Sequence, residues 1–501
     1  MKFLNSLYNS FITNAARNAF CIQDTMYSYE ELNNAIESIR NIIQQKIGFE
    51  HQYVGLVLRD DLTTYASIFA LWFEGKAYVP INPAAPISRN LETLNKIGAR
   101  AIFDTQTNGA DFEGIELVCT NDEYSNTVVS GSFSTTFENI DSINHAYVLF
   151  TSGSTGKPKG IPISFGNVDA LINGLGTDDN FSIQDNDRCL QMYDLTFDAS
   201  LTAILPAMLA GACLYTVDPG SIKYFQILKL LNRYELTVLK MVPSIIHYLR
   251  PYFDQILAKQ VRYCIFGGGK LFDDILSEWR KCIPNSIIVN HYGPTESTVC
   301  SHRYYISKNQ PKTYNGIVSI GKPWPKLDCI IVDESNNMLE NGKEGELCIS
   351  GPQLTGGYWM NDMLNTSVFF DCKHESGELK RYYKTGDLCY RDNEGDFLFV
   401  GRKDFQVKVR GYRVELAEIE FHIKQITNLV DVIAIDVENS LGNTEIGVGF
   451  VGQPFEMGDL LSKMRTKVPS YMVPTRHAFF NDFPMNSNGK IDRKQLRLKF
   501  K

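Results

Sequence analysis

A stretch rich in glycine and hydroxyl groups, Thr151-Ser-Gly-Ser-Thr-Gly-Lys-Pro-Lys-Gly160, offers the densest set of chemical groups in the sequence. It follows the apolar run 146–150, which predicts a strand that ends in this loop. Such a loop can turn successive backbone N–H groups inward, and its lysines add positive charge. It differs from a Walker A loop, because Pro158 rather than Ser or Thr follows Lys157. We interpret it as a phosphate-binding loop of another type.

The loop resembles the signature loop of the enzymes that form acyl- and aminoacyl-adenylates. Five further motifs follow in the order of that family: Gly75-Lys-Ala-Tyr-Val-Pro-Ile-Asn-Pro83, Asn290-His-Tyr-Gly-Pro-Thr-Glu296, Tyr383-Lys-Thr-Gly-Asp387, Gly401-Arg-Lys-Asp-Phe-Gln-Val-Lys-Val-Arg-Gly411 and Asn488-Gly-Lys-Ile-Asp-Arg493. The family includes adenylation domains of nonribosomal peptide synthetases, D-alanine carrier-protein ligases, acyl-CoA synthetases and firefly luciferase. Because the motifs extend over nearly the whole chain, the sequence is identified as a member of this family.

The resemblance implies a reaction in two steps that uses ATP and Mg²⁺. A carboxylate first attacks the α-phosphate of ATP, which gives an acyl-AMP and pyrophosphate, and a thiol then displaces AMP. The first step needs a positioned nucleotide, a metal ion and positive charge where the carboxylate meets the phosphate. The implied partner is a separate carrier protein with a phosphopantetheine arm.

The same resemblance assigns the nucleotide-binding residues. Adenine would lie between the Tyr292 ring and the backbone of a glycine run, Asp387 would accept the ribose hydroxyls, and Arg402 would contact ribose or phosphate. The remaining residues of this set are Thr151, Ser152, Gly153, Ser154, Thr155, Gly156, Lys157, Gly267, Gly268, Gly269, Asn290, His291, Gly293, Thr295 and Lys490.

Three residues are implied to be catalytic. Lys490 would bridge the substrate carboxylate and the α-phosphate, and Thr295 would donate to the α-phosphate. Glu296 would supply a hard oxygen ligand to Mg²⁺, a cation that binds few protein carboxylates and completes its shell with phosphate oxygens and water. Asp404 occupies the family's hinge position, where a few backbone torsions would move the C-terminal residues between the two steps.

The motif Phe197-Asp-Ala-Ser200 resembles that of family members that activate amino acids, and it makes Asp198 the expected partner of a substrate α-ammonium group. A fatty or aryl acid would leave that buried carboxylate unpaired at a large cost. The other expected pocket positions are Ala199, Thr202, Lys240, Ile265, Gly267, His291, Val299 and Cys300, together with Lys490.

Lys240 is unexpected in the apolar run 236–243, where a lysine should lie either at the rim of a sheet or in a pocket beside a negative charge. With His291 it places two potential cations in the pocket. The pattern is similar to that of aspartate-selective adenylation domains. We therefore expect the substrate to be L-aspartate or a related acidic amino acid.

The elements that must hold these residues follow from hydrophobic periodicity. The runs 53–58, 62–74 and 77–81 read as strand, helix and strand, which predicts an α/β fold with parallel sheets flanked by helices. From residue 401 the pattern changes to strands at 406–409, 412–415, 431–437 and 445–451 with helices at 416–426 and 460–467. We expect a large N-terminal lobe, 1–403, and a small α+β C-terminal lobe, 404–501, that carries Lys490.

Composition narrows the classes of protein. The formal net charge is −8, which argues against binding to a nucleic acid. No apolar stretch approaches the roughly 20 residues that a membrane span needs, and the N-terminus lacks a signal-peptide core. The eleven cysteines form no C-x-x-C pair, which suggests reduced core thiols. We expect a cytoplasmic enzyme without further domains.

Two alternatives remain open from the sequence. A D-alanine–carrier protein ligase of the same fold fits the chain length but gives Lys240 no purpose. A non-catalytic protein that binds a carrier is disfavoured because Glu296, Asp387 and Lys490 are all present.

Overall fold

The computed structural model describes residues 1–48, 51–106, 112, 114–121, 134–151, 158–176, 180–307, 310–373, 377–429, 431–485 and 491–500. The chain divides into two compact units. The first contains residues 1–83, 94–149 and 160–401, and the second contains 84–93, 150–159 and 402–501. Two short segments from the N-terminal half therefore belong to the unit that holds the C-terminal hundred residues.

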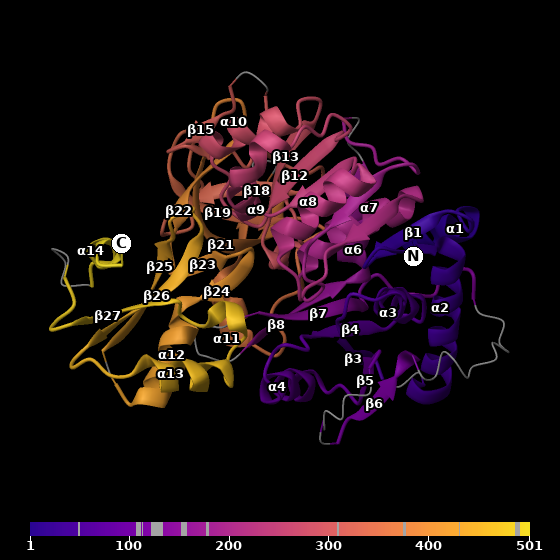
Figure 1. Ribbon diagram of the computed structural model, residues 1–501, viewed down its shortest axis with the longest axis horizontal. Coiled ribbons are helices and arrows are strands. Elements are labelled where there is room, and N and C mark those ends of the chain that lie inside the picture. Colours follow the sequence, from indigo (N-terminus) through magenta and orange to yellow (C-terminus); the bar gives the residue numbers. More distant parts are fainter. Residues whose placement is uncertain are drawn as a thin grey trace. The chain divides into compact units, whose positions relative to one another are not determined.

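A nine-stranded sheet forms the centre of the first unit (Figure 1). Its order is β17 (Lys322–Pro323), β14 (His302–Tyr305), β13 (Ile287–Tyr292), β12 (Tyr263–Gly267), β11 (Val238–Met241), β9 (Arg188–Gln191), β10 (Cys213–Thr216), β1 (Asn18–Ile22) and β2 (Thr25–Ser28). The strands from β13 to β1 are parallel, and the strands at the two edges are antiparallel. The carboxyl ends of β11, β12 and β13 consequently meet at one edge, where ligands of parallel sheets bind.

Helices cover both faces of this sheet. On one face, strand residues such as Ile265 and Val289 pack in the same core as α6 (Phe165–Gly176) and α7 (Leu201–Ala210). On the other face, Leu239 and Phe266 pack with α8 (Lys223–Tyr234), α9 (Ser244–Leu249) and α10 (Asp273–Cys282). A strand that is buried on both faces reads as a continuous apolar run, which explains the run around Lys240.

A six-stranded sheet of the order β6 (Glu116–Cys119), β5 (Ala101–Asp104), β3 (Tyr53–Val57), β4 (Ala77–Ile81), β7 (His145–Thr151) and β8 (Lys159–Ser164) lies earlier in the chain. Helices α1 (Lys2–Thr13), α2 (Tyr29–Ile42), α3 (Leu62–Phe73) and α4 (Ile87–Ile97) accompany it. A capping box of Ser28 and Glu31 starts α2. The predicted strand, helix and strand at 53–81 are confirmed by β3, α3 and β4.

A third sheet, between residues 328 and 402, is antiparallel. It consists of β18 (Asp328–Val332), β19 (Gly345–Ser350), β21 (Leu379–Arg391), β20 (Phe369–Lys373) and β22 (Phe397–Arg402), with the short helix α11 (Asp362–Val368) alongside. A small hairpin of β15 (Thr313–Tyr314) and β16 (Ile317–Val318) precedes it. Strand–helix alternation did not predict this sheet, because its hairpins need no crossover helix.

The C-terminal part of the second unit follows the sequence prediction closely. Strands β23 (Gln406–Val409) and β24 (Tyr412–Glu415) form a hairpin whose turn residues Arg410 and Gly411 both have positive φ. It continues with α12 (Leu416–Thr427), β25 (Val432–Glu438), β26 (Thr444–Val451), α13 (Met457–Arg465), β27 (Arg476–Phe480) and α14 (Arg493–Leu498). The predicted apolar stripe of α12 packs in the core of this unit.

Two expectations from the sequence concern membrane-spanning segments and the cysteines. Within the described ranges, no helix combines the length and the apolar character that crossing a bilayer requires. All eleven cysteines are free thiols, and nine of them are buried.

Candidate active site

The expected substrate positions, called the specificity cluster below, gather at the carboxyl ends of the central strands. The cluster consists of Asp198, Ala199, Thr202, Lys240, Ile265, Gly267, His291, Val299 and Cys300. Lys240 pairs with Ile265 across β11 and β12, and Gly267 pairs with His291 across β12 and β13. Because side chains alternate along a strand, this register places Lys240 and His291 on the same face of the sheet.

Lys240 and His291 form a buried pair. The Lys240 Nζ lies 3.0 Å from His291 Nδ1, and the two residues are 4% and 7% exposed. Because β11 is a central strand, the alternative position of Lys240 at a solvent-exposed rim is excluded. An ammonium group can only donate, so His291 Nδ1 accepts and the proton of the neutral ring is on Nε2.

The electrostatics of the pair are dominated by burial. Burial lowers the pKa of Lys240 from its usual value, and nearby Cys300 opposes that shift. Burial also lowers the pKa of His291 well below its usual value, with further contributions from the charges of Lys240 and Arg303. Arg303 pairs with His291 across β13 and β14, so a second cationic side chain besides Lys240 lies on this face. No sequence motif indicated Arg303, since only the strand register places it there.

Asp198 starts the short 3₁₀ helix η2 (Asp198–Ser200), which leads directly into α7. It is 7% exposed. Burial and the charge of Asp198 raise the pKa of Tyr78 and Tyr147, so both phenols lie near this carboxylate. One turn further, the Thr202 hydroxyl donates to the Ala199 carbonyl at 2.7 Å. The structure thus brings the Phe-Asp-x-Ser motif into the cluster with a buried carboxylate.

Val299 and Cys300 lie in a strained segment. The φ angles of Thr298 and Val299 are +54° and +70°, a region that β-branched residues rarely adopt. The side-chain amide of buried Gln353 donates to the Cys300 carbonyl at 2.7 Å, and the Thr298 hydroxyl donates to the Gln353 carbonyl at 2.5 Å. Gln353 therefore holds this segment, a role that the sequence analysis did not assign.

Gly293 and Asn290 each have a structural role. A Cβ atom on Gly293 would lie 2.6–2.7 Å from backbone atoms of residues 299–301, so only glycine fits there. The Asn290 amide donates to the Ser319 carbonyl at 2.9 Å and fastens the end of β13. Their predicted contribution to nucleotide binding stays a prediction.

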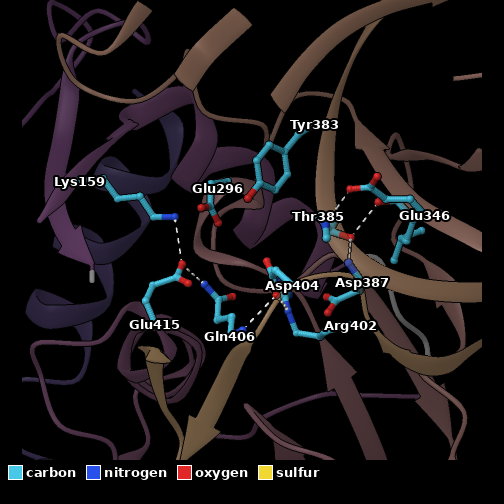
Figure 2. Close-up of polar contacts among 12 residues, drawn as sticks. Lys159, Glu296, Glu346, Tyr383, Thr385, Asp387, Arg402, Asp404, Gln406 and Glu415 are labelled. Carbon is cyan, nitrogen blue, oxygen red and sulfur yellow. Dashed lines mark hydrogen bonds and ion pairs between the residues drawn. The ribbon is translucent and has the colours of Figure 1, made fainter. Parts of the chain in front are cut away.

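Tyr292 and Asp387, two of the predicted nucleotide-binding residues in the first unit, also contact each other. The Tyr292 hydroxyl donates to the Asp387 carboxylate, and the Asp387 backbone N–H donates to Thr385 Oγ1 at 3.1 Å. The Gly386 N–H donates to Glu346 Oε1 at 3.0 Å, which fixes the part of β21 that carries Asp387 (Figure 2). Tyr292 follows His291 at the end of β13, and Gly267 at the end of β12 is the strand partner of His291, with Gly268 and Gly269 next.

Glu296 lies in the 3₁₀ turn η4 (Thr295–Ser297) and is 0% exposed. Its Oε1 accepts a hydrogen bond from the Tyr358 hydroxyl at 2.5 Å, and Tyr358 contacts the Tyr383 hydroxyl at 3.2 Å. Among the described residues, no group of three or more His, Cys, Asp or Glu side chains forms a metal site. An oriented hard carboxylate fits a Mg²⁺ ion whose remaining ligands are phosphate oxygens and water.

In the second unit, Arg402 and Asp404 form a bidentate ion pair with both N–O distances at 2.6 Å (Figure 2). Burial raises the pKa of Asp404, but Arg402, the Gln406 backbone N–H and Arg413 together outweigh it, and the net shift of the pKa is downward. Lys159, from the end of the glycine-rich stretch, lies 3.5 Å from Glu415 Oε1, which also accepts from the Gln406 amide. This lysine therefore has a carboxylate partner within its own unit.

Several predicted residues lie outside the described residues. They are Ser152, Gly153, Ser154, Thr155, Gly156 and Lys157 of the glycine-rich loop, and Lys490. Thr151, at the end of β7, is described and buried.

The fold and these motifs define an adenylate-forming enzyme. The family model for AMP-binding enzymes matches residues 12–359, and the chain belongs to this family. The predicted family and fold class are thereby confirmed.

Individual relatives support the same family. Zwittermicin A synthase ZmaJ of Bacillus cereus is 30% identical over 493 residues, which are 94% of this chain and 90% of that protein. Tyrocidine synthase 1 of Brevibacillus parabrevis is 29% identical over 490 residues, which are 96% of this chain and 43% of that protein. The chain thus spans less than half the length of Tyrocidine synthase 1, and it spans 44% of Gramicidin S synthase 1 of Brevibacillus brevis.

Among solved structures, the chain is similar to the Vibrio cholerae adenylation domain AlmE in complex with glycyl-adenosine-5'-phosphate. The TM-score is 0.84 at 26% identity, and the match covers 99% of this chain and 97% of that one. This similarity extends over both units.

Proposed function

We propose that this chain activates L-aspartate, or a closely related acidic amino acid, as an aminoacyl-adenylate and transfers it to the phosphopantetheine thiol of a separate carrier protein. The observation that carries the proposal is the buried pair of Lys240 and His291 in the specificity cluster. The AlmE complex with glycyl-adenosine-5'-phosphate supports the reaction class.

The charge balance of the cluster favours an acidic side chain. A buried ammonium group is costly unless a negative charge lies beside it. Lys240 is buried with His291 and near Cys300, and Arg303 adds a further positive charge to this face. Asp198 would pair with the α-ammonium group of the amino acid. A side-chain carboxylate would then compensate Lys240, whereas the methyl group of D-alanine would not.

In the first step, a carboxylate oxygen of the amino acid bonds to the α-phosphorus of ATP and pyrophosphate leaves. Tyr292 and the run Gly267–Gly269 would hold adenine, Asp387 would accept the ribose hydroxyls, and the loop 151–157 would hold the β- and γ-phosphates. Glu296 would hold Mg²⁺, which would neutralise charge on the phosphates when bound. Thr295 and Lys490 would donate to the oxygens that meet at the α-phosphorus.

In the second step, the carrier thiolate attacks the carbonyl carbon, a thioester bond forms, and AMP leaves with the electron pair of the broken bond. The thiol proton goes to solvent. A rotation at Asp404 would withdraw Lys490 between the two steps, as in the family that the chain belongs to. The bidentate contact of Arg402 with Asp404 would hold one arrangement of the hinge.

Amino-acid-dependent exchange of labelled pyrophosphate into ATP tests the proposal, with the twenty common amino acids and D-alanine. Exchange that depends on L-aspartate supports it. Exchange that depends on D-alanine would make the chain a D-alanine ligase, and no exchange at all would favour a non-catalytic carrier-binding protein. Lys490→Ala should lower the exchange rate by about two to three orders of magnitude, and Lys499→Ala is the matched control.

A further inference from the structure

Trp324 is a buried indole whose N–H has no hydrogen-bond partner among the residues that the structure describes. It follows β17, is 1% exposed, and its Nε1 is buried and unpaired. The backbone holds it in place, because its amide donates to the Ser301 carbonyl at 2.8 Å. Buried donors in native proteins are nearly always satisfied by protein, water or ligand. The N–H is therefore left for an acceptor that the described residues do not supply.

The Trp324 indole lies against residues of the specificity cluster. It shares one apolar contact group with Ala199, Val299 and Cys300. Its ring also meets the His291 ring edge to face, with the centroids 5.5 Å apart and an interplanar angle of 76°. Four of the nine cluster positions thus share an apolar contact group or a ring contact with one tryptophan that the sequence motifs did not single out.

A glycine on α6 fixes the direction of the ring. A Cβ atom on Gly174 would lie 2.5 Å from Cε3 and 3.3 Å from Cζ3 of Trp324, so the indole packs directly on the helix backbone. In an indole, Nε1 lies on the edge opposite Cε3. The edge that packs against Gly174 is therefore not the edge that carries the N–H.

We propose that Trp324 is a further specificity-determining residue, whose indole N–H donates a hydrogen bond to the side-chain carboxylate of the amino acid substrate. This inference rests on the proposed function and adds a residue to it. It also explains why the site would accept an acid and reject its amide.

The hydrogen-bond donors of the site favour a carboxylate as the side chain of the substrate. The indole N–H only donates, and so does the Lys240 ammonium group. His291 Nδ1 accepts from Lys240, which leaves its Nε2–H as a third donor. A carboxylate accepts from all three groups. The amide NH₂ of asparagine would bring two donors to these donors, and a buried donor without a partner is costly.

The test compares Trp324→Phe, which keeps the ring and removes the N–H, with Trp279→Phe. Trp279 is 0% exposed and packs on the other face of the sheet with Leu239 and Phe266, so its replacement alters a buried indole outside the cluster. For Trp324→Phe, kcat/KM for L-aspartate in pyrophosphate exchange should fall about ten- to a hundredfold, with KM for ATP unchanged. Selectivity for L-aspartate over L-asparagine should fall with it, and Trp279→Phe should leave both unchanged.

Calorimetric titration of the full-length chain with L-aspartate and L-asparagine, with AMP present, separates this inference from the proposed function. If the wild type binds L-aspartate but exchanges no pyrophosphate, the proposed function fails, and weaker binding by Trp324→Phe still supports the inference. Equal exchange selectivity and equal binding in the wild type and Trp324→Phe, including a lack of binding in both, overturn the inference.

Discussion

Lys240 Nζ and His291 Nδ1 are 3.0 Å apart on neighbouring parts of one sheet face, although 51 positions separate the two residues in the chain. The contact orients both groups. Lys240 keeps its remaining N–H donors for a ligand, and His291 keeps its Nε2–H. Burial and the charges of Lys240 and Arg303 hold the pKa of His291 well below its usual value, so the imidazole is neutral at pH 7. The site therefore presents one buried cationic donor, Lys240, and one oriented neutral donor, His291.

Replacement of Lys240 by methionine removes the charge and preserves most of the side-chain volume. The preference for L-aspartate over L-asparagine or L-alanine should fall by about one to two orders of magnitude, because a hydrogen bond to a charged group contributes roughly 1.5–3 kcal/mol. The measurement is the ratio of kcat/KM values in pyrophosphate exchange. Unchanged ratios would remove Lys240 from substrate recognition.

Lys76→Met is the matched control for that substitution. Lys76 is also buried, and its ammonium group donates to the carbonyls of Gly48 and His51 at 2.6 and 2.8 Å, away from the specificity cluster. Loss of this lysine should lower the free energy of unfolding without altering the ratio of kcat/KM values for L-aspartate over L-asparagine or L-alanine. A similar fall of selectivity in both variants would indicate a general effect of losing a buried lysine.

Much of the fold was predictable because it depends on local signals. The spacing of Leu416, Ile419 and Ile423 predicts α12, and all three side chains are buried. The strand that carries Lys240 reads as an apolar run because helices cover both faces of the sheet. The order of the motifs along the chain predicted the specificity positions. The register of β11, β12 and β13 then places those on the strands close together.

The residues that support the site were not predictable for a physical reason. Arg303 reaches His291 only through the antiparallel pairing of β14 with β13. Tyr358 contacts Glu296 across 62 positions, and Gln353 contacts Cys300 across 53. No period or local motif encodes such contacts. They arise when separate elements pack, so a single sequence contains no signal for them.

The Tyr358 hydroxyl orients Glu296, and its removal should weaken Mg²⁺ binding. Tyr358→Phe should raise the Mg²⁺ concentration for half-maximal exchange by about tenfold, since partners of metal ligands commonly change affinity by 10–100-fold. Tyr382→Phe is the control. Tyr382 is buried and donates to the Asp328 carboxylate at 2.7 Å in the third sheet. If both variants require the same Mg²⁺ concentration as the wild type, Glu296 does not depend on Tyr358.

Gln353 holds the strained Thr298–Val299 segment, so loss of its side-chain amide should weaken binding of the amino acid. Gln353→Met leaves the Cys300 and Ser297 carbonyls without the amide donor that lies 2.7 and 3.2 Å from them. We expect unfolding free energy to fall by about 2–3 kcal/mol and KM for the amino acid to rise several-fold more than KM for ATP. Steady-state exchange with each substrate varied in turn measures this. Equal changes in the two KM values would contradict a local role.

His302 should make the first unit sensitive to acid. It is 0% exposed, its ring lies edge-on to Tyr292 and Phe397, and burial lowers its pKa from 6.5 to about 3. The unfolded chain therefore binds a proton below pH 6.5 that the folded chain does not bind until about pH 3. Stability is lost as pH falls through this window, by about 2 kcal/mol between pH 7 and pH 5.

His302→Phe should remove that part of the loss, whatever its packing cost at neutral pH, because packing changes do not depend on pH. Urea denaturation of the wild type and His302→Phe at pH 7 and pH 5 measures the difference in slope. His477→Phe is the control, because His477 is exposed on β27. Parallel pH profiles for the wild type and His302→Phe would show that His302 takes up its proton equally in the folded and unfolded chain.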